Sequence, residues 1–297
     1  MSSSRKSKRT LNVLDNPIKT AAIIFALAVA LVFSITAGWA WVSGNILPAT
    51  TLGLYDRGFW ENVLVEMHGM VVELAVVGVL LLWLDGRRDK KKNLDQCRED
   101  LKNYATLDFP EAHLKKIGAL KTLVEASEVG LDARYLHLSG RTLTEINIAD
   151  WNLIGFKING GKLEDSMFRG VDARSSNFVQ CKIKNTTFEG GSLYRCKFEG
   201  ARLRQVIFRN VRIASAEFTH CDMPSTVFHG VSLQGVKFDG ANLDNCSFKS
   251  AFDIDVHELS RAATLNHIAI SDELLIQLIE LRPDMKYQFR RVRPQGN

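Results

Sequence analysis

The sequence predicts an all-β solenoid with helical caps, preceded by a two-helix transmembrane hairpin. Two observations predict this fold. A large apolar residue recurs at every fifth position from residue 138 to residue 248, and two long apolar runs precede that repeat. A period of five fits neither a strand, whose side chains alternate every two residues, nor an α-helix, which turns by about 100° per residue. A chain that turns a corner every five residues points each apolar residue at a common axis.

The N-terminal part contains the two apolar runs. A basic segment at residues 1–19 precedes an uncharged run at 20–42, which is long enough to cross a bilayer core. A secretory signal peptide is the competing interpretation, but the run is too long for one and ends without a clear small-residue cleavage site. After a loop at 43–62, the second run at 63–84 contains the ionisable residues Glu66, His68 and Glu73.

The distribution of positive charge predicts the topology of this hairpin. Lysine and arginine residues precede the first run and follow the second, whereas the loop between them contains only Arg57. Because cytoplasmic flanks carry the excess of positive charge, both chain ends are predicted to be cytoplasmic and the loop periplasmic. The cluster after the second run could also contact anionic lipid head groups. It consists of Arg87, Arg88, Lys90, Lys91 and Lys92.

Glu73 lies near the middle of the second predicted span, where an ionised carboxylate is costly. One interpretation is a proton- or cation-sensitive contact, or a pore lining formed by several hairpins, with Glu66 and His68 nearby. The other is a protonated Glu73 that hydrogen-bonds to Ser34 or Thr36 within one hairpin. The first span also has a stripe of small residues that allows close helix contact. The stripe consists of Ala22, Ala26, Ala30, Ser34 and Gly38.

Residues 85–130 are predicted to form a cytoplasmic helical linker and the N-terminal cap of the solenoid. The linker has a heptad-like seam, and a second helix opens at Pro110 and ends near Gly130. The seam residues are Leu94, Cys97, Leu101 and Tyr104, and the expected apolar side of the second helix is Leu114, Ile117, Leu120 and Val124. Helices at 251–297, which end in a basic tail, are expected to cap the other end.

The solenoid at 131–250 passes a further test of its period. If four corners close one coil, residues twenty apart should stack, and sorting the centres at that interval gives two facing ladders of phenylalanine between two aliphatic walls. Such a tube has no room for a ligand. Small or β-branched residues, including Cys181, Cys196, Cys221 and Cys246, precede most centres by two, and Gly or Asn commonly follows by two. The core phenylalanines are Phe168, Phe178, Phe188, Phe198, Phe208, Phe218, Phe228, Phe238 and Phe248.

The segment Ala241-Asn242-Leu243-Asp244-Asn245 resembles the A-(D/N)-L-x-x motif of bacterial pentapeptide-repeat proteins. The resemblance spans about 115 residues and implies a right-handed quadrilateral β-helix. With the predicted hairpin, the chain is expected to be a bacterial inner-membrane protein. The helical segment at 255–285 resembles the tail that follows the repeats in many family members. The best-characterised members mimic DNA and bind type II topoisomerases, which needs an acidic surface. Residues 131–250 carry sixteen Lys or Arg against twelve Asp or Glu, which disfavours that role.

The sequence offers little for catalysis. "GGKL" at 160–163 lacks the spacing and the Ser or Thr of a phosphate loop, and the repeat brings together no set of Ser, His and Asp. We therefore expect no enzyme activity, no cofactor and no metal. Free cysteines agree with a reducing compartment, since they need no disulfide partner there.

The predicted function is a membrane-tethered, non-catalytic scaffold that presents a rigid cytoplasmic surface to an unknown protein partner. The alternative is a membrane-perturbing effector, for example in phage defence or stress, that assembles through its hairpin. A topoisomerase-binding DNA mimic is the third reading, which both the charge balance and the tether oppose. Assembly into a homo-oligomer stays open, and nucleic acid is not expected as a partner.

Overall fold

The computed structural model describes residues 17–46 and 55–287. They belong to two compact units, Met1–Lys90 and Lys91–Asn297. Most of the basic N-terminal segment, part of the predicted periplasmic loop and the basic tail lie outside the described residues. The roles expected of those segments therefore stay predictions.

The first unit contains α1 (Pro17–Ala37), α2 (Trp39–Asn45) and the beginning of α3 (Arg57–Tyr104). Instead of one straight helix over 20–42, the chain bends by 72° between α1 and α2. The bend is at Gly38, whose φ of −92° and ψ of 9° leave the helical region. By length and hydropathy, α3 could cross a membrane, and α1 with α2 could do so if the bent pair counts as one span.

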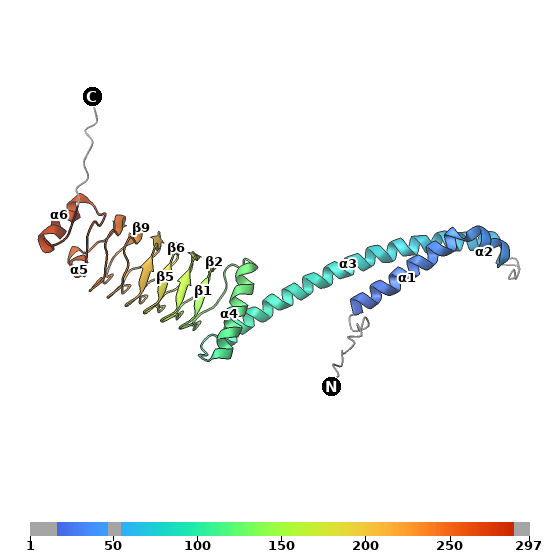
Figure 1. Cartoon of the computed structure of the whole chain (residues 1–297), viewed down its shortest axis with the longest axis horizontal. Coiled ribbons are helices and arrows are strands. Elements are labelled where there is room, and N and C mark those ends of the chain that lie inside the picture. The colour runs from blue at the N-terminus through green and yellow to red at the C-terminus, as the bar shows by residue number, and fades with distance from the viewer. Residues whose placement is uncertain (1–16, 47–54, 288–297) are drawn as a thin grey trace, which may run out of the picture. The chain divides into compact units, whose positions relative to one another are not determined.

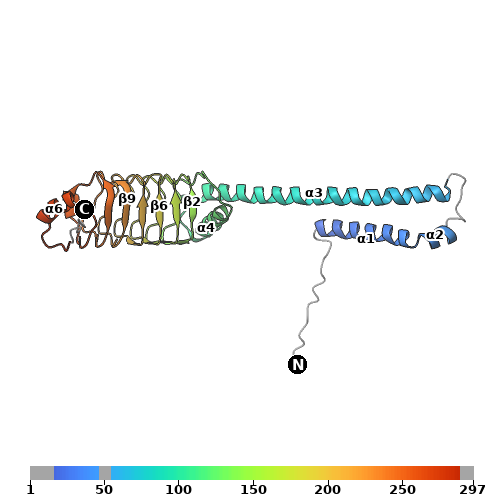
Figure 2. The ribbon, with the colours of Figure 1, turned by 90° about the horizontal axis from the view of Figure 1, so that it is seen from above.

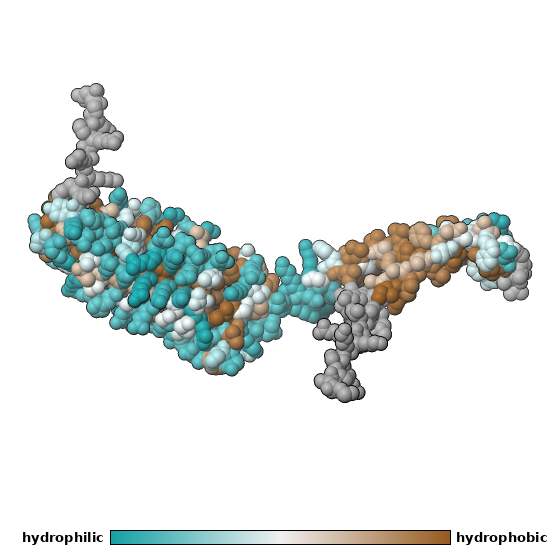
Figure 3. Space-filling model, in the orientation of Figure 1, coloured by the Kyte–Doolittle hydropathy of each residue, from teal (hydrophilic) through white to brown (hydrophobic). Residues whose placement is uncertain are grey.

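Apolar side chains cover the surface of this unit. In Figure 3 the hydrophobic residues gather on α1 and on the first half of α3. Leu27, Val72 and Leu82 are each at least half exposed. A contiguous apolar surface of this kind is unusual on a soluble protein and marks a surface that lipid or another protein covers.

The second unit begins with the end of α3, which packs on the first coil of the solenoid. Leu101 is fully buried, and the carbonyl of Ala105 accepts a hydrogen bond from the backbone N–H of His137 at 2.8 Å. After a short loop, α4 (Pro110–Glu125) starts with Pro110 in its first turn, where the missing N–H has no helical partner to lose.

Helix α4 covers the first coil with a face different from the expected one. Leu114 is 74% exposed, although Leu120 is buried as predicted. Ala112, Lys116 and Leu123 lie fully buried instead. Small Ala residues let the helix approach closely, and the backbone beneath supplies carbonyl partners for the Lys116 amine. The close approach of the helix and the hydrogen bonds of Lys116 therefore decide which face of α4 is buried, although Leu114 is apolar.

The solenoid is a stack of parallel strands in which each coil adds twenty residues (Figure 1, Figure 2). One face is a four-stranded sheet, β1-β3-β5-β7, and another is a six-stranded sheet, β10-β9-β8-β6-β4-β2. Partners such as Leu163 and Ile183 confirm the step of twenty. The strands are β1 (Thr142–Thr144), β2 (Asn147–Ala149), β3 (Lys162–Glu164), β4 (Met167–Arg169), β5 (Lys182–Lys184), β6 (Thr187–Glu189), β7 (Arg202–Arg204), β8 (Ile207–Arg209), β9 (Val227–Ser232) and β10 (Ser247–Phe252).

A corner with positive φ falls at every fifth residue from Gly130 to Asn245. Glycine or asparagine fills about half of these corners, as the sequence indicated, because both tolerate left-handed backbone. The others hold residues that rarely adopt it, such as Glu145, Arg195 and Gln205, each with φ between 55° and 58°. The closed coil therefore imposes the corner even where the local preference opposes it.

The phenylalanine ladders predicted from the sequence fill the core. Phe178, Phe198 and Phe218 stack with ring centroids 4.8 Å apart and nearly parallel planes. The facing ladder meets them edge to face, as with Phe198 and Phe208 at 6.1 Å and 81°. The single small centre, Ala173, lines a void of only about 10 Å³, which Phe156 and Phe178 also line. That is scarcely room for one water molecule.

The β-stacking continues past residue 250. Strand β10 reaches Phe252, and a further partial coil pairs Thr264 with Asn242 and Ala269 with Ser247. These pairs are 22 residues apart rather than twenty, because α5 (Val256–Ser260) replaces one regular corner. Helix α6 (Asp272–Leu281) then covers the end of the stack with Leu275 and Leu278.

Candidate functional site

Of the three ionisable residues in the second apolar run, His68 is the one that contacts α1. Its Nδ1 lies 2.7 Å from the carbonyl of Leu64, and its Nε2 lies 3.2 Å from Thr36 Oγ1. The ring also meets Phe33 edge to face at 5.6 Å. Since a carbonyl oxygen only accepts, His68 Nδ1–H donates to Leu64, and the Thr36 hydroxyl donates to the carbonyl of Val32 at 2.8 Å.

Glu66 and Glu73 lie on the exposed surface of α3. Within the described residues, Glu73 forms no hydrogen bond with Ser34, Thr36 or any other group, so the single-hairpin contact expected for it is absent. Thr36 is engaged by His68 instead. Both carboxylates therefore face whatever surrounds the helix.

The small-residue stripe of the first span does not pack against α3. Ala22, Ala26 and Ser34 are exposed, whereas Val32 is buried at 3% exposure. Larger residues thus make the contact within the hairpin.

The basic cluster after the second run is fully exposed along α3. Arg87, Arg88, Lys90, Lys91 and Lys92 all lie on the helix surface. The guanidinium of Arg87 lies 4.2 Å from the ring centroid of Trp83. A cation at this distance over an indole ring makes a favourable cation–π contact.

The four solenoid cysteines lie inside the tube, and the thiols of Cys196, Cys221 and Cys246 donate to the preceding coil. Cys221 Sγ donates to the carbonyl of Phe198 at 2.8 Å, and Cys246 Sγ donates to that of Met223 at 3.1 Å. Burial raises the pKa of Cys181, Cys221 and Cys246 to about 12. Thiols held neutral and inaccessible are poor nucleophiles.

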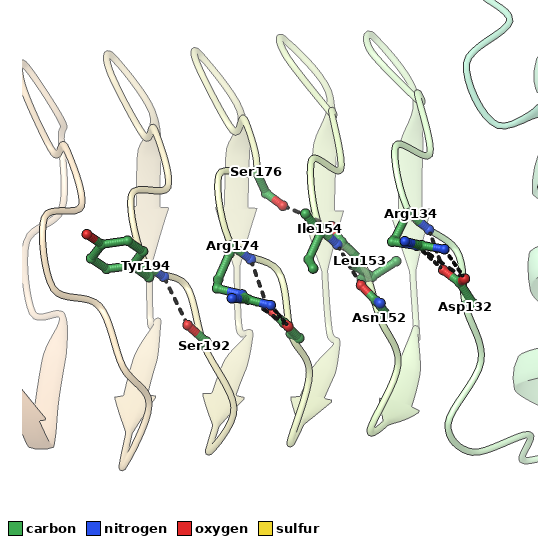
Figure 4. A network of polar contacts seen from close by, with 10 residues as sticks. Asp132, Arg134, Asn152, Leu153, Ile154, Arg174, Ser176, Ser192 and Tyr194 are labelled. Carbon is green, nitrogen blue, oxygen red and sulfur yellow. Dashed lines mark hydrogen bonds and ion pairs between the residues drawn. The ribbon is translucent and has the colours of Figure 1, made fainter.

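Polar side chains on the outer surface form repeated turns. In Figure 4 the side-chain oxygens of Asp132, Asn152 and Ser192 each accept from the backbone N–H two residues on, with N–O distances of 3.3 Å. Asp172 does the same and also binds the guanidinium of Arg174 at 2.8 Å. These groups stabilise the coil and are occupied by it.

The N-terminal cap contains a polar cluster that the sequence analysis missed. The amine of fully buried Lys116 donates to the carbonyls of Leu107 at 2.6 Å, Ala105 at 3.4 Å and His137. Asp108 Oδ1 lies 2.7 Å from His113 Nε2. Burial lowers the pKa of Lys116 and of His137, and the hydrogen bond from His113 lowers the pKa of Asp108. In the sequence, the only indication of this polar cluster is that Lys116 shares one helical face with Ala112 and Ala119.

A second feature missed in the sequence is a basic face on the sheet β1-β3-β5-β7. Lys162, Lys182 and Arg202 are directly paired in register along one row. Lys184 and Arg204 follow Glu164 in a second row, which begins with Thr144 on β1. The sequence contains this face as basic residues twenty positions apart, but the total charge of the solenoid does not show how they are arranged.

Comparison with protein-family models identifies pentapeptide repeats, in eight copies, at residues 176–210, 192–230 and 212–249. A comparison with curated proteins found no match. Each matched segment lies in the solenoid, where the structure has its five-residue corners.

Several solved structures are similar to the chain. HetL, a pentapeptide repeat protein involved in heterocyst differentiation regulation from the cyanobacterium Nostoc, has 13% identity over 45% of this chain and 68% of its own, with a TM-score of 0.27. A trypsin-treated variant of QnrB1, a plasmid-mediated fluoroquinolone resistance protein, has 16% identity over 51% and 88%, with a TM-score of 0.29. A pentapeptide repeat protein of the Arabidopsis thaliana thylakoid lumen has 18% identity over 47% and 90%, with a TM-score of 0.26. The matched repeats lie within a solenoid of about six turns, so residues 176–249 of this chain consist of pentapeptide repeats.

Proposed function

We propose that this chain is a non-catalytic scaffold, tethered to the bacterial inner membrane by its N-terminal hairpin, whose solenoid presents a rigid cytoplasmic surface to a protein partner. The observation that carries the proposal is the filled core. Paired phenylalanine ladders leave about 10 Å³ beside Ala173, so ligands meet the solenoid at its outer faces.

Rigidity follows from the same packing. Each coil is held to the next by backbone hydrogen bonds on its faces, by stacked rings and by inward side chains. A surface built this way loses little conformational entropy when it binds. That property suits a docking platform better than a reaction site, where mobile groups and a substrate cavity are usual.

The tether is supported by the apolar surface of α1 and α3 and by the charges beside it. Val72 and Leu82 are exposed to whatever surrounds α3, and the cluster from Arg87 to Lys92 follows directly. This order of apolar span and positive flank predicts a cytoplasmic solenoid.

Reporter fusions test the tether. A cytoplasm-active reporter after Gly130 or Asn297 is expected to be active, and a periplasm-active reporter is expected to be active at Asn45. A periplasmic signal at Asn297 would contradict the proposed location.

A membrane-perturbing effector is the second candidate, and the exposed carboxylates of Glu66 and Glu73 favour it. On an apolar helix, unpaired ionisable groups are costly unless another copy or water meets them. Overexpression is expected to leave the membrane potential unchanged if the chain is a scaffold. Collapse of the potential that depends on Glu73 would promote the effector.

A further inference from the structure

The cations of the basic face lie as a compact block on three strands. Lys162 on β3, Lys182 on β5 and Arg202 on β7 occupy one row, and Lys184 and Arg204 occupy the second. All five side chains are exposed. Neighbouring parallel strands are about 4.8 Å apart, so these like charges lie directly beside one another. Such pairs repel and lower the stability of the sheet.

Four of these cations have no counter-ion within the described residues. Arg204 is paired with Asp222 at 2.6 Å, whereas Lys162, Lys182, Lys184 and Arg202 make no ion pair there. On the six-stranded sheet, by contrast, Glu189 lies between Arg169 and Arg209 at 3.5 and 3.7 Å. The block is thus a positive patch in which, among the described residues, only Arg204 has an ion-pair partner.

An acidic residue bounds each row of cations at one end. Glu164 precedes Lys184 in the second row, and Asp222 follows Arg202 in the first. The uninterrupted cations therefore cover two strand intervals, or about 10 Å. A nucleic acid typically contacts a protein through six to ten phosphates, and an extended patch is needed for that. The sheet face also lacks aromatic residues on which bases could stack.

We propose that this basic face, formed by Lys162, Lys182, Lys184, Arg202 and Arg204, docks an acidic α-helix of a partner protein that lies along the solenoid axis. Acidic residues three and four apart follow one face of a helix at steps of about 5 Å, close to the spacing of the strands. An extended strand presents its side chains to one face at about 6.7 Å, and so falls out of step after one interval.

The partner helix would match the basic face in both spacing and charge. Each turn of the partner helix brings one carboxylate to one strand, and the two rows of cations flank the helix on both sides. The inference deepens the proposed scaffold function by naming its face and its partner's chemistry. It does not depend on the membrane topology, so a failed topology experiment and a failed binding experiment are distinguishable.

The test uses the full chain in detergent and two synthetic peptides of identical composition. One peptide places glutamates three and four residues apart on one helical face, and the other distributes them around the helix. Binding is measured by fluorescence anisotropy. The first peptide is expected to bind at least about tenfold more tightly, because it alone aligns its carboxylates with the strands.

Two triple variants locate the contact. Lys162→Gln, Lys182→Gln and Arg202→Gln together are expected to weaken binding about tenfold, since three exposed ion pairs are lost. The matched control, Lys157→Gln, Lys197→Gln and Lys237→Gln, removes the same charge from a different face and is expected to change binding less than about twofold. Circular dichroism confirms that each variant keeps its fold.

Three outcomes would overturn the proposal. They are equal weakening by both triple variants, equal binding of both peptides, and tighter binding of a DNA duplex or of anionic phosphatidylglycerol vesicles than of the aligned peptide.

Discussion

Cys196 Sγ donates a hydrogen bond to the carbonyl oxygen of Ala173 at 2.9 Å, across 23 residues of sequence. The same step joins Ser176 Oγ to the carbonyl of Leu153 at 3.1 Å. The small inward position can therefore hold a donor as well as a side chain of limited size. Ser176, Cys196, Cys221 and Cys246 each donate to a carbonyl of the preceding coil.

Removing the inward hydroxyl of Ser176 and that of Thr226 should change the free energy of unfolding differently. Ser176→Ala deletes a buried donor and is expected to lower the free energy of unfolding by about 1 kcal/mol. The Thr226 hydroxyl is buried without a partner in the described structure, so Thr226→Val should be neutral or stabilising. Urea unfolding of residues 91–297 measures both. Equal destabilisation would mean that the Thr226 hydroxyl has a partner.

The core should tolerate no charge. Phe208→Asp puts a carboxylate between the stacked rings of Phe188 and Phe228 and is expected to abolish folding of residues 91–297. Arg209→Ala, one residue on, removes an exposed side chain 3.7 Å from Glu189 and should change stability by less than about 0.5 kcal/mol. Circular dichroism during heating compares them. Indistinguishable melting of the two variants would show the inward register to be wrong.

The N-terminal cap should lose stability in mild acid. Burial holds the pKa of His137 below its ordinary value, so the unfolded chain takes up this proton first. Stability is then expected to fall as the pH drops below about 6.5 and to level off below the folded pKa. Asp108 adds a later loss, as the pH falls from its ordinary range, near 4, to its lowered folded pKa.

His137→Gln should flatten the first part of that pH profile. The control is His257→Gln on α5, where the side chain is exposed. Urea midpoints between pH 5 and 8 give the comparison. A slope that persists in His137→Gln would assign the titration to another group.

Arg282 should fasten the C-terminal cap. Its guanidinium donates to the carbonyls of Ser260 at 2.9 Å, Ala263 at 3.3 Å and Ala262, and it pairs with Asp284. Arg282→Gln is expected to cost about 2 kcal/mol, because the fork serves several acceptors at once. Exposed Arg261→Gln should cost little. Hydrogen exchange in α6 reports the loosening, and protection unchanged in Arg282→Gln would contradict this role.

Glu73→Gln tests whether that carboxylate has a role. Gln keeps the shape and removes the charge, so a scaffold should insert and assemble as before, with no change in cellular phenotype. An inserted but inactive variant would favour the membrane effector. Because the structure gives Glu73 no partner on α1, Glu73→Leu should also leave hairpin contacts intact, whereas Thr36→Val should weaken the contact with His68.

The solenoid could be predicted almost completely, because one period determines both its core and its corners. Phe168 to Phe248 are inward, and Leu163 stacks on Ile183, as the interval of twenty required. The non-glycine corners were not evident, since Arg195 and Gln205 have no local preference for positive φ. Closure of the coil determines their backbone, and closure is a property of the whole repeat.

The ends and the hairpin were less predictable because their contacts come from several elements at once. The burial of Lys116 depends on the carbonyls of Leu107 and His137, which belong to a loop and to the first coil. Apolar periodicity alone favoured Leu114 for that face. Likewise, the partner of Thr36 depends on how α1 and α3 rotate against each other, and hydropathy does not determine that rotation.

The unbroken step of five restricts how the gene can lengthen or shorten this domain. Loss of a single codon between Gly130 and Asn245 would turn every later inward residue outward. Loss of five codons would keep the core but rotate all following faces by a quarter turn, and between Lys182 and Arg202 it would separate Arg202 from the other two cations of its row. Only duplication or deletion of twenty codons preserves both core and faces, so one whole coil is the natural unit of inheritance here.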